Sequence, residues 1–378
     1  MSQNQQLEKK ISALLDSSGV QFFRALPVEE MAGFRERAME RARALGKDRE
    51  LCALVEQISN PRSVYPWVRT VLLFGCNMND ELSQPDRAPT EPYGRVGRWL
   101  IYLPRYSAVA REVANLLEAG GFRALWETDH YYPLRPAAVR AGLARFRRNN
   151  FVYHEQFGSW VGWWQVLTDA EFDHETLVDD IWDTDICEDC PGYCIDACPT
   201  KALSAPYTFD ADRCVRRRNL APDEVVPVDL RDGFRNWLIG CDACQEACPL
   251  NQNVPVLRRP QFARASLPPD SIFSLTGQNN FVEIVPILEQ QLRPSQNIAT
   301  VNMLKRNAAI ILGSTRDKRG IPALIKALHD DSVTVRAHAA WALGRLDEIN
   351  PLKKALRLEQ DAIVQREIES ALKAPMSR

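Results

Sequence analysis

Eight of the ten cysteines in this 378-residue chain lie between residues 187 and 248, while Cys52 and Cys76 stand apart. The clustered residues form the groups Cys187-x2-Cys190-x3-Cys194-x3-Cys198-Pro199 and Cys241-x2-Cys244-x3-Cys248-Pro249, with Cys214 between them. Thiolates separated by two or three residues are typical metal ligands. Disulfides are not expected, because the chain is large and no secretion signal is recognisable. The cysteines therefore indicate a metal centre.

The Cys-Pro ending of each group indicates how the thiolates are shared. In ferredoxin-type proteins with two clusters, the last cysteine of such a run binds the other cluster. This crossover rule assigns one [4Fe-4S] cluster to Cys187, Cys190, Cys194 and Cys248. It assigns the second cluster to Cys198, Cys214, Cys241 and Cys244. The eight cysteines then fill two clusters without remainder, which predicts an electron relay.

Two zinc sites with four cysteines each are the alternative, because zinc ribbons also use CxxC pairs. Zinc ribbons do not need the repeated Cys-Pro ending that crossover ligation produces. One irregularity is the three-residue spacer between Cys190 and Cys194, where bacterial ferredoxins have two residues. Gly192 lies in this spacer and is expected to absorb the extra residue. Two iron–sulfur clusters are the favoured interpretation.

The overall composition excludes several other classes of function. Hydrophobic residues make up 45% of the chain and charged residues 25%, as in ordinary globular proteins. The net charge is −2, so no overall field attracts nucleic acid or a membrane surface. No run of about 18 successive apolar residues occurs. These features predict a soluble, cytoplasmic protein without a membrane segment.

The helical and strand patterns of the segments around the cysteines predict an α+β protein. Residues 1–180 alternate helical and strand patterns, including an apolar run at 70–75, and predict an α/β domain in which helices cover a sheet. Residues 181–260 form the cysteine-rich, ferredoxin-like unit, and residues 261–296 form a proline-containing connector. The remaining residues, 297–378, have a helical pattern throughout.

The C-terminal helical region repeats itself. The segment 335–344 resembles the segment 304–313, and a weaker third copy covers 364–372. Residues 320–328 supply the second helix of a helical hairpin. Such repeats are typical of HEAT-like solenoids, which are generally binding surfaces. A local basic face of the kind that binds RNA is expected from Lys305, Arg306, Arg316, Lys318, Arg319 and Lys326.

Several blocks of the sequence, taken in order, resemble one known family. They are Asn60-Pro61-Arg62-Ser63, Phe157-Gly158-Ser159-Trp160-Val161, Leu167-Thr168-Asp169, Cys198-Pro199-Thr200-Lys201-Ala202-Leu203, Gly240-Cys241-Asp242-Ala243-Cys244-Gln245 and Ala339-Ala340-Trp341-Ala342-Leu343-Gly344-Arg345-Leu346. Together they resemble the epoxyqueuosine reductases, which are cobalamin-dependent enzymes that modify tRNA. The resemblance covers nearly the whole chain.

The resemblance implies an N-terminal domain that binds base-off cobalamin, in addition to the two clusters. Electrons from an unidentified donor would pass through the clusters and reduce the cobalamin to Co(I). The reduced cobalt would attack the epoxide of a modified nucleoside in the tRNA anticodon, and a carboxylic acid would supply a proton. The product would be queuosine. This fold would permit a monomer.

The resemblance also nominates site residues. Asp129 is the candidate proton donor, although counting without gaps places Thr128 at the acid's position. Gln165 stands where the family usually has a glutamate. Candidate cofactor-binding residues are Arg147, Arg148, Asn149 and Ser159, of which the arginines suit phosphate groups.

Because the residues at the positions of the family's acid and glutamate differ from the family's pattern, two other functions stay open. One is a ferredoxin-like electron-transfer or interaction protein on the same scaffold, without corrin chemistry. The other is a reductase of a different small molecule.

Overall fold

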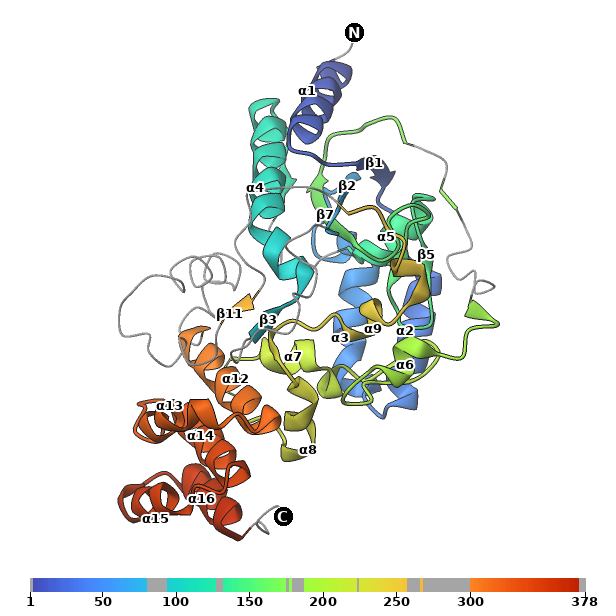
Figure 1. Cartoon of the computed structure of the whole chain (residues 1–378). Helices are drawn as coiled ribbons and strands as arrows, with labels where there is room; N and C mark the ends of the chain where they lie inside the picture. Colours follow the sequence, from blue (N-terminus) through green and yellow to red (C-terminus); the bar gives the residue numbers. More distant parts are fainter. Residues whose placement is uncertain are drawn as a thin grey trace.

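The computed structural model describes residues 3–79, 94–126, 132–174, 177–178, 187–222, 224–256, 266–267 and 300–373. Figure 1 shows three regions that follow one another through the molecule: an N-terminal sheet with its helices, the cysteine-rich unit, and a stack of C-terminal helices. Mixed helix and strand with a helical C-terminal part confirms the predicted fold class. The predicted connector, 261–296, lies outside the described residues except at 266–267.

The N-terminal region is built on a four-stranded sheet. The strand order is β1 (Phe22–Pro27), β2 (Thr70–Asn77), β7 (Val161–Thr168) and β4 (Ala124–Leu125), and all neighbouring strands are antiparallel. Every residue of β2 and β7 is buried. The predicted strand at 70–75 is therefore confirmed, and its continuous apolar run follows from burial on both faces.

Helices cover both faces of this sheet. Leu72, Phe74 and Trp164 point to one face, where they pack with α1 (Gln3–Ser17) and α4 (Arg98–Ala119). The alternate residues Val71, Leu73 and Trp163 pack on the other face with α5 (Leu134–Arg140). Burial of each such large side chain stabilises the fold by about 1.5–3 kcal/mol.

The N-terminal region contains further short elements. They are α2 (Ala32–Ala44), α3 (Asp48–Ser59), η1 (Pro61–Ser63), β3 (Gly94–Val96), β5 (Arg145–Phe146) and β6 (Val152–Tyr153). Strand β3 pairs in parallel with β10 (Trp237–Ile239) and antiparallel with β11 (Ser266–Leu267). Two glycines allow the chain to pass closely here, because a Cβ on Gly240 would lie 2.9 Å from Cα of Gly97. Gly240 also has a φ of +74°, which favours glycine.

The cysteine-rich unit consists of short elements. They are α6 (Tyr193–Asp196), β8 (Leu203–Ala205), β9 (Thr208–Phe209), η3 (Ala211–Arg213), α7 (Val215–Asn219), α8 (Val228–Arg231), η4 (Asp232–Phe234), α9 (Ala243–Glu246) and η5 (Pro249–Asn251). Helices α6 and α9 contact each other. Few large apolar side chains are buried between these two helices, which is expected if another group occupies the centre of the unit.

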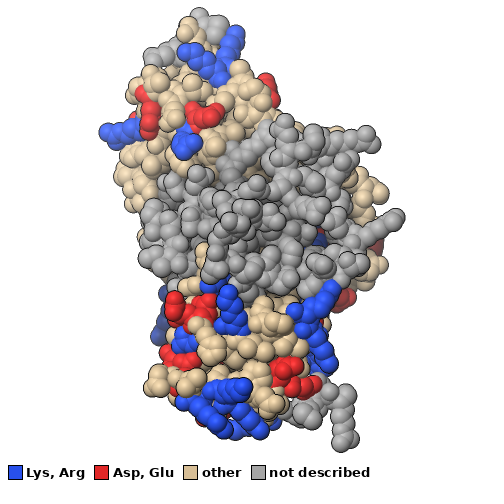
Figure 2. Space-filling view, turned by 60° about the vertical axis from the view of Figure 1, so that its left-hand side comes forward, with Lys and Arg blue, Asp and Glu red and all other residues tan. Residues whose placement is uncertain are grey.

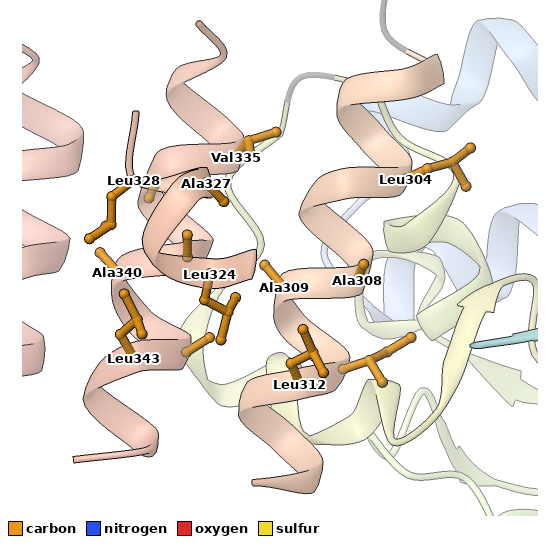
Figure 3. Close-up of a cluster of buried hydrophobic side chains, with 14 of the residues drawn as sticks. Leu304, Ala308, Ala309, Leu312, Leu324, Ala327, Leu328, Val335, Ala340 and Leu343 are labelled. Atoms are coloured by element: carbon orange, nitrogen blue, oxygen red, sulfur yellow. The ribbon is translucent and has the colours of Figure 1, made fainter. Parts of the chain in front are cut away.

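The C-terminal helices form the predicted repeats. They are α12 (Thr300–Thr315), η7 (Lys318–Gly320), α13 (Ile321–Ala327), α14 (Val333–Arg345), α15 (Ile349–Leu358) and α16 (Ala362–Lys373). Equivalent residues of successive copies, such as Leu312 and Leu343, point into one shared core (Figure 3). Each helix pair buries its apolar face only by stacking on the next pair, which is how a solenoid is stabilised.

Buried polar side chains attach these helices to the cysteine-rich unit. The guanidinium group of Arg306 is fully buried and donates hydrogen bonds to the carbonyl oxygens of Arg218, Ala221 and Glu224. The expectation that Arg306 belongs to an exposed basic face was therefore wrong. Its charge satisfies the backbone of the neighbouring unit, because α12 packs against that unit rather than facing solvent.

A second attachment joins α8 to α16. Arg231, which is 1% exposed, donates two hydrogen bonds to the carboxylate of Glu367, at 2.9 and 2.6 Å. The charge of Arg231 is compensated at a buried interface, so this pair fixes the angle between the unit and the last helix.

Candidate metal centre

Two short helices position most of the cysteines. Cys194 lies in α6 and Cys244 lies in α9, and the remaining members of each CxxC group lie in the adjoining turns. Gly192 immediately precedes α6 and has a φ of +96°, a left-handed conformation that glycine adopts without strain. The three-residue spacer before Cys194 is thus accommodated at Gly192, as the sequence predicts.

Thiols of the first group interact electrostatically across the two helices. Cys194 interacts electrostatically with Cys187, Cys190 and Cys248, although Cys248 is more than 50 residues away in the sequence. Burial, together with these neighbours, raises the pKa of Cys194 to about 11. Burial also raises the pKa of Cys248. The thiols of Cys194 and Cys248 therefore resist ionisation unless a cation compensates their charge.

The second group is similar and more deeply enclosed. Cys241 and Cys244 each interact with Cys198 and Cys214. Burial is the main cause that raises the pKa values of Cys214, Cys241 and Cys244 above the ordinary value. A bound metal deprotonates such thiols outright, because its positive charge compensates the thiolates. The chemistry of both groups therefore fits iron held by cysteine sulfur.

Backbone N–H groups are directed at several of the sulfur atoms. The N–H of Gly192 lies 3.5 Å from Sγ of Cys190, and the N–H of Leu203 lies 3.5 Å from Sγ of Cys198. Cys214 accepts hydrogen bonds from the backbone of Arg216 and Arg217. Hydrogen bonds of this kind stabilise the negative charge on cluster sulfurs and tune their reduction potentials.

Two cations lie near the second group. Arg135 interacts with the thiols of Cys214 and Cys244, and its guanidinium group donates a 2.9 Å hydrogen bond to the carbonyl of Asn150. Arg216 also faces Cys214, and its guanidinium group lies over the ring of Trp99, 4.9 Å from the centroid. Positive charge at these positions favours an anionic cluster.

Three of the four candidate cofactor-binding residues contact the cysteine-rich unit. Arg148 donates hydrogen bonds to the carbonyls of Glu188 and Cys190, at 3.2 and 2.7 Å. Asn149 is buried, and its Nδ2 lies 3.4 Å from the carbonyl oxygen of Cys244. The fourth, Arg147, is buried and donates to the carbonyl of Phe146.

Ser159 belongs to a buried network that the sequence did not reveal. Its hydroxyl donates to Oε1 of Gln245 at 2.9 Å and accepts from Nδ2 of Asn251 at 2.8 Å. Its backbone N–H donates to Oδ1 of Asn251 at 2.9 Å. Gln245 in turn donates to Asp242, next to Cys241. This network holds the turn before β7 against α9, between residues about 90 positions apart in the sequence.

Tyr153 is another residue that sequence reasoning missed. It lies on β6 and is buried, and burial together with the nearby thiol of Cys248 raises the pKa of its hydroxyl well above the ordinary value. No spacing motif links these two residues, so the sequence carries no signal that would identify their proximity. The candidate proton donor Asp129 and the neighbouring Thr128 lie outside the described residues.

Comparisons with known proteins agree with this arrangement. The family model for the 4Fe-4S double cluster binding domain matches residues 186–251, and the model for HEAT repeats matches residues 285–373. Over 252 residues, which are 63% of this chain and 60% of its relative, the chain is 30% identical to the epoxyqueuosine reductase of Bacillus subtilis (strain 168). Over 341 residues, or 84% of each chain, it is 26% identical to the epoxyqueuosine reductase of Bacillus cereus.

The chain is similar to epoxyqueuosine reductases over most of its length. The crystal structure of selenomethionine-labelled epoxyqueuosine reductase superimposes with a TM-score of 0.75, covering 98% of this chain and 99% of the other at 23% identity. A crystal structure of epoxyqueuosine reductase with an epoxyqueuosine-modified tRNA-Tyr stem loop has a TM-score of 0.73 at 22% identity. The family's fold therefore extends over the described parts of all three regions. Among the described residues, no helix is long and apolar enough to cross a membrane.

Proposed function

We propose that this protein is a cobalamin- and iron–sulfur-dependent reductase that converts epoxyqueuosine to queuosine in tRNA. The alignment with the Bacillus subtilis relative spans 60% of that protein's length, so the activity is inferred for this chain. The observation that carries the proposal is the pattern of electrostatic interactions among the cysteines, which links Cys194 with Cys187, Cys190 and Cys248, and links Cys241 and Cys244 with Cys198 and Cys214. Because its substrate is tRNA, the reaction would take place in the cytoplasm.

The proposed ligand sets follow the crossover rule. Cys187, Cys190, Cys194 and Cys248 would bind one [4Fe-4S] cluster, and their mutual interactions support this assignment. The other cluster would be bound by Cys198, Cys214, Cys241 and Cys244. Two clusters within one small unit would carry electrons from an external donor to the N-terminal domain.

Gln165 supports cobalamin binding in the N-terminal domain. Its side chain is only 4% exposed, yet neither its Nε2 nor its Oε1 has a hydrogen-bond partner among the described residues. A buried amide without partners is unfavourable by about 1–3 kcal/mol per group. The amide side chains around a corrin ring offer the donors and acceptors that Gln165 lacks, so this residue fits the cofactor. When bound, cobalamin supplies a strongly nucleophilic reduced cobalt.

The other candidate residues would hold the two domains together, bind a phosphate group or supply a proton. Arg148, Asn149 and Ser159 would hold the cysteine-rich unit against the N-terminal domain, since their hydrogen bonds span this junction. Arg147 would offer a cation to the phosphate of a bound cofactor. Asp129 would supply the proton to the opened epoxide.

The C-terminal helices would contribute to RNA binding. Exposed cations on them include Lys318, Arg319, Lys326, Lys353 and Lys354. Figure 2 shows Lys and Arg side chains interspersed with Asp and Glu over this end of the molecule, so the basic face is local rather than general. A local basic face would bind phosphates despite the net charge of −2.

Spectroscopy and a nucleoside assay test the proposal. The protein is purified anaerobically, reconstituted with iron and sulfide, incubated with cobalamin and freed of excess. Retention of a stoichiometric corrinoid that a strong reductant converts to Co(I), and conversion of epoxyqueuosine in tRNA measured by mass spectrometry, are the expected results. If the broad iron–sulfur absorbance appears without bound corrinoid, the electron-transfer alternative replaces the reductase.

A cysteine variant tests the ligand assignment. Replacement Cys241→Ala removes one ligand of the second set and is expected to lower the iron content by about half, because the first set remains complete. Cys52→Ala is the matched control, since Cys52 is exposed and belongs to neither set. Equal iron loss in both variants would contradict the assignment.

A further inference from the structure

The turn between α2 and α3 carries a lysine from the N-terminal region to the cysteine-rich unit. Nζ of Lys47 donates hydrogen bonds to Oδ1 of Asp210 and Oδ2 of Asp212, at 2.6 and 2.5 Å. The lysine side chain is 22% exposed, so the ion pair is only partly removed from water. One ammonium group thus holds two carboxylates that lie 163 and 165 positions away in the sequence.

The backbone of this turn is fixed independently of the ion pair. Helix α2 ends at Ala44, and Gly46 has a φ of +66°, the left-handed conformation that often follows a helix. The N–H of Gly46 donates to the carbonyl of Arg43 at 2.9 Å. The N–H of Lys47 donates to the carbonyl of Ala42 at 2.8 Å, which completes a Schellman motif. The N-terminal region therefore presents Lys47 from a well-defined position.

Both carboxylates lie in the turn that precedes Cys214. Asp210 is the N-cap of η3, and its Oδ1, the atom that binds Lys47, also accepts a 3.0 Å hydrogen bond from the N–H of Asp212. At the other end of η3, the N–H of Cys214 donates to the carbonyl of Ala211 at 3.0 Å. Lys47 is therefore connected to Cys214 through the cap and one turn of backbone.

Among the eight clustered cysteines, Cys214 has no close neighbour in the sequence. It lies 16 residues after Cys198 and 27 residues before Cys241, whereas each of the other seven lies within four residues of another cysteine. Short spacers hold the sulfur atoms of those seven near one another. The position of the Cys214 sulfur depends instead on the turn around η3.

We propose that Lys47 is a positioning residue that fixes Cys214 as a ligand of the second cluster and thereby slows the loss of that cluster. This inference rests on the proposed ligand assignment. Asp210 and Asp212 share one ammonium group, so they lie close together and repel each other when it is removed. The repulsion opens the turn around η3, and the ligand at its end moves away from its iron more readily.

The experiment follows transfer of iron to EDTA from the reconstituted full-length protein, under anaerobic conditions and without cobalamin or RNA. Lys47→Met removes the charge and keeps the aliphatic part of the side chain. We expect half of the iron to be released about fivefold faster than in the wild type, and the other half at the wild-type rate. Fivefold corresponds to about 1 kcal/mol, which is the upper range for a partly exposed ion pair.

A second background assigns the faster half to a cluster. Cys241→Ala removes a ligand of the second set and leaves the first set complete. In this background, Lys47→Met should leave iron release unchanged, because the cluster that depends on Cys214 is already missing. Faster release from the remaining cluster would show that Lys47 does not act through Cys214, and the inference would be overturned.

Arg35→Met is the matched control. Arg35 on α2 also bridges two carboxylates, those of Glu30 and Glu56, at 2.5 and 3.3 Å, but all three residues lie in the N-terminal region. Its loss should leave both release rates at their wild-type values. Lys47→Arg should restore slow release, because a guanidinium group can bridge the same two carboxylates. Equal acceleration by Arg35→Met, or no restoration by Lys47→Arg, would contradict the inference.

Salt provides a readout that a packing defect would not change. Because salt screens partly exposed charges, raising the ionic strength from about 0.01 M to about 1 M should speed release from the second cluster in the wild type but not in Lys47→Met. The same salt dependence in both proteins would overturn the inference. A wild-type protein that does not assemble two clusters refutes the ligand assignment itself. Two assembled clusters with equal release rates in the wild type and Lys47→Met refute the inference alone.

Discussion

His338 links the C-terminal helices to the cysteine-rich unit and should make their attachment sensitive to pH. The residue lies on α14 and is fully buried. Its Nδ1 lies 2.6 Å from the carbonyl oxygen of Thr334, and its Nε2 accepts a 3.1 Å hydrogen bond from the N–H of Val226. This pattern requires a neutral imidazole with its proton on Nδ1. Protonation of Nε2 would remove the acceptor and place a charge near Arg231 and Arg306.

The size of the effect follows from the pKa. Burial, together with the two arginines, holds the pKa of His338 well below its usual value in the folded protein. In the unfolded chain the pKa is about 6.5. The stability contribution is present above about pH 6.5 and is lost as the pH falls, because only the unfolded chain then takes up the proton. Between about pH 7.5 and about pH 5.5, the free energy of unfolding should fall by about 1.4 kcal/mol, because the folded protein takes up no proton at His338 in this range.

The replacement His338→Gln isolates this contribution. The glutamine carbonyl oxygen can accept the hydrogen bond from the N–H of Val226, but the side chain does not titrate. Urea unfolding is measured at both pH values for both proteins, and the pH dependence of the variant is subtracted from that of the wild type. The wild type should lose about 1.4 kcal/mol more than the variant. Equal losses would show that His338 is not kept neutral, and the reasoning would be refuted.

Two further replacements test how the C-terminal helices pack. In Gly344→Ala, the new Cβ would lie 2.6 Å from Cβ of Ala371, so α14 and α16 must separate and the free energy of unfolding should fall by about 1–3 kcal/mol. Gly33→Ala on α2 is the control, since nothing lies within 4 Å of its new Cβ, and a lower melting temperature there as well would contradict the packing argument. Glu367→Gln leaves the buried Arg231 without its carboxylate and should cost about 2 kcal/mol in denaturant unfolding, whereas an unchanged midpoint would show that the pair is dispensable.

The sequence alone determined the features that depend on short-range spacing. Cysteine groups separated by two or three residues and closed by proline predict clusters because neighbouring thiolates must reach adjacent iron atoms. The apolar run at 70–75 predicts a buried strand, and the copies at 304–313 and 335–344 predict stacked helices, since each copy carries its own apolar face. The structure and the family comparisons confirm the strand and the repeats.

Charge and hydrogen-bonding roles were decided by tertiary structure. Arg306 was predicted as part of a basic face and is instead buried against backbone carbonyls, because an arginine on a helix has no sequence signal for which side packs. The network around Ser159 joins residues about 90 positions apart, and no local pattern indicates which amide will meet which hydroxyl.

Tyr153 shows the same limit most directly. Its hydroxyl accepts a hydrogen bond from Asn149, whose amide also approaches the carbonyl oxygen of Cys244, only because the β5–β6 hairpin packs against α9. Cysteine spacing determines which sulfur atoms can bind iron, since it depends on the reach of a few residues of chain. The groups that surround those sulfur atoms come from distant segments, so their identity depends on how the domains pack together.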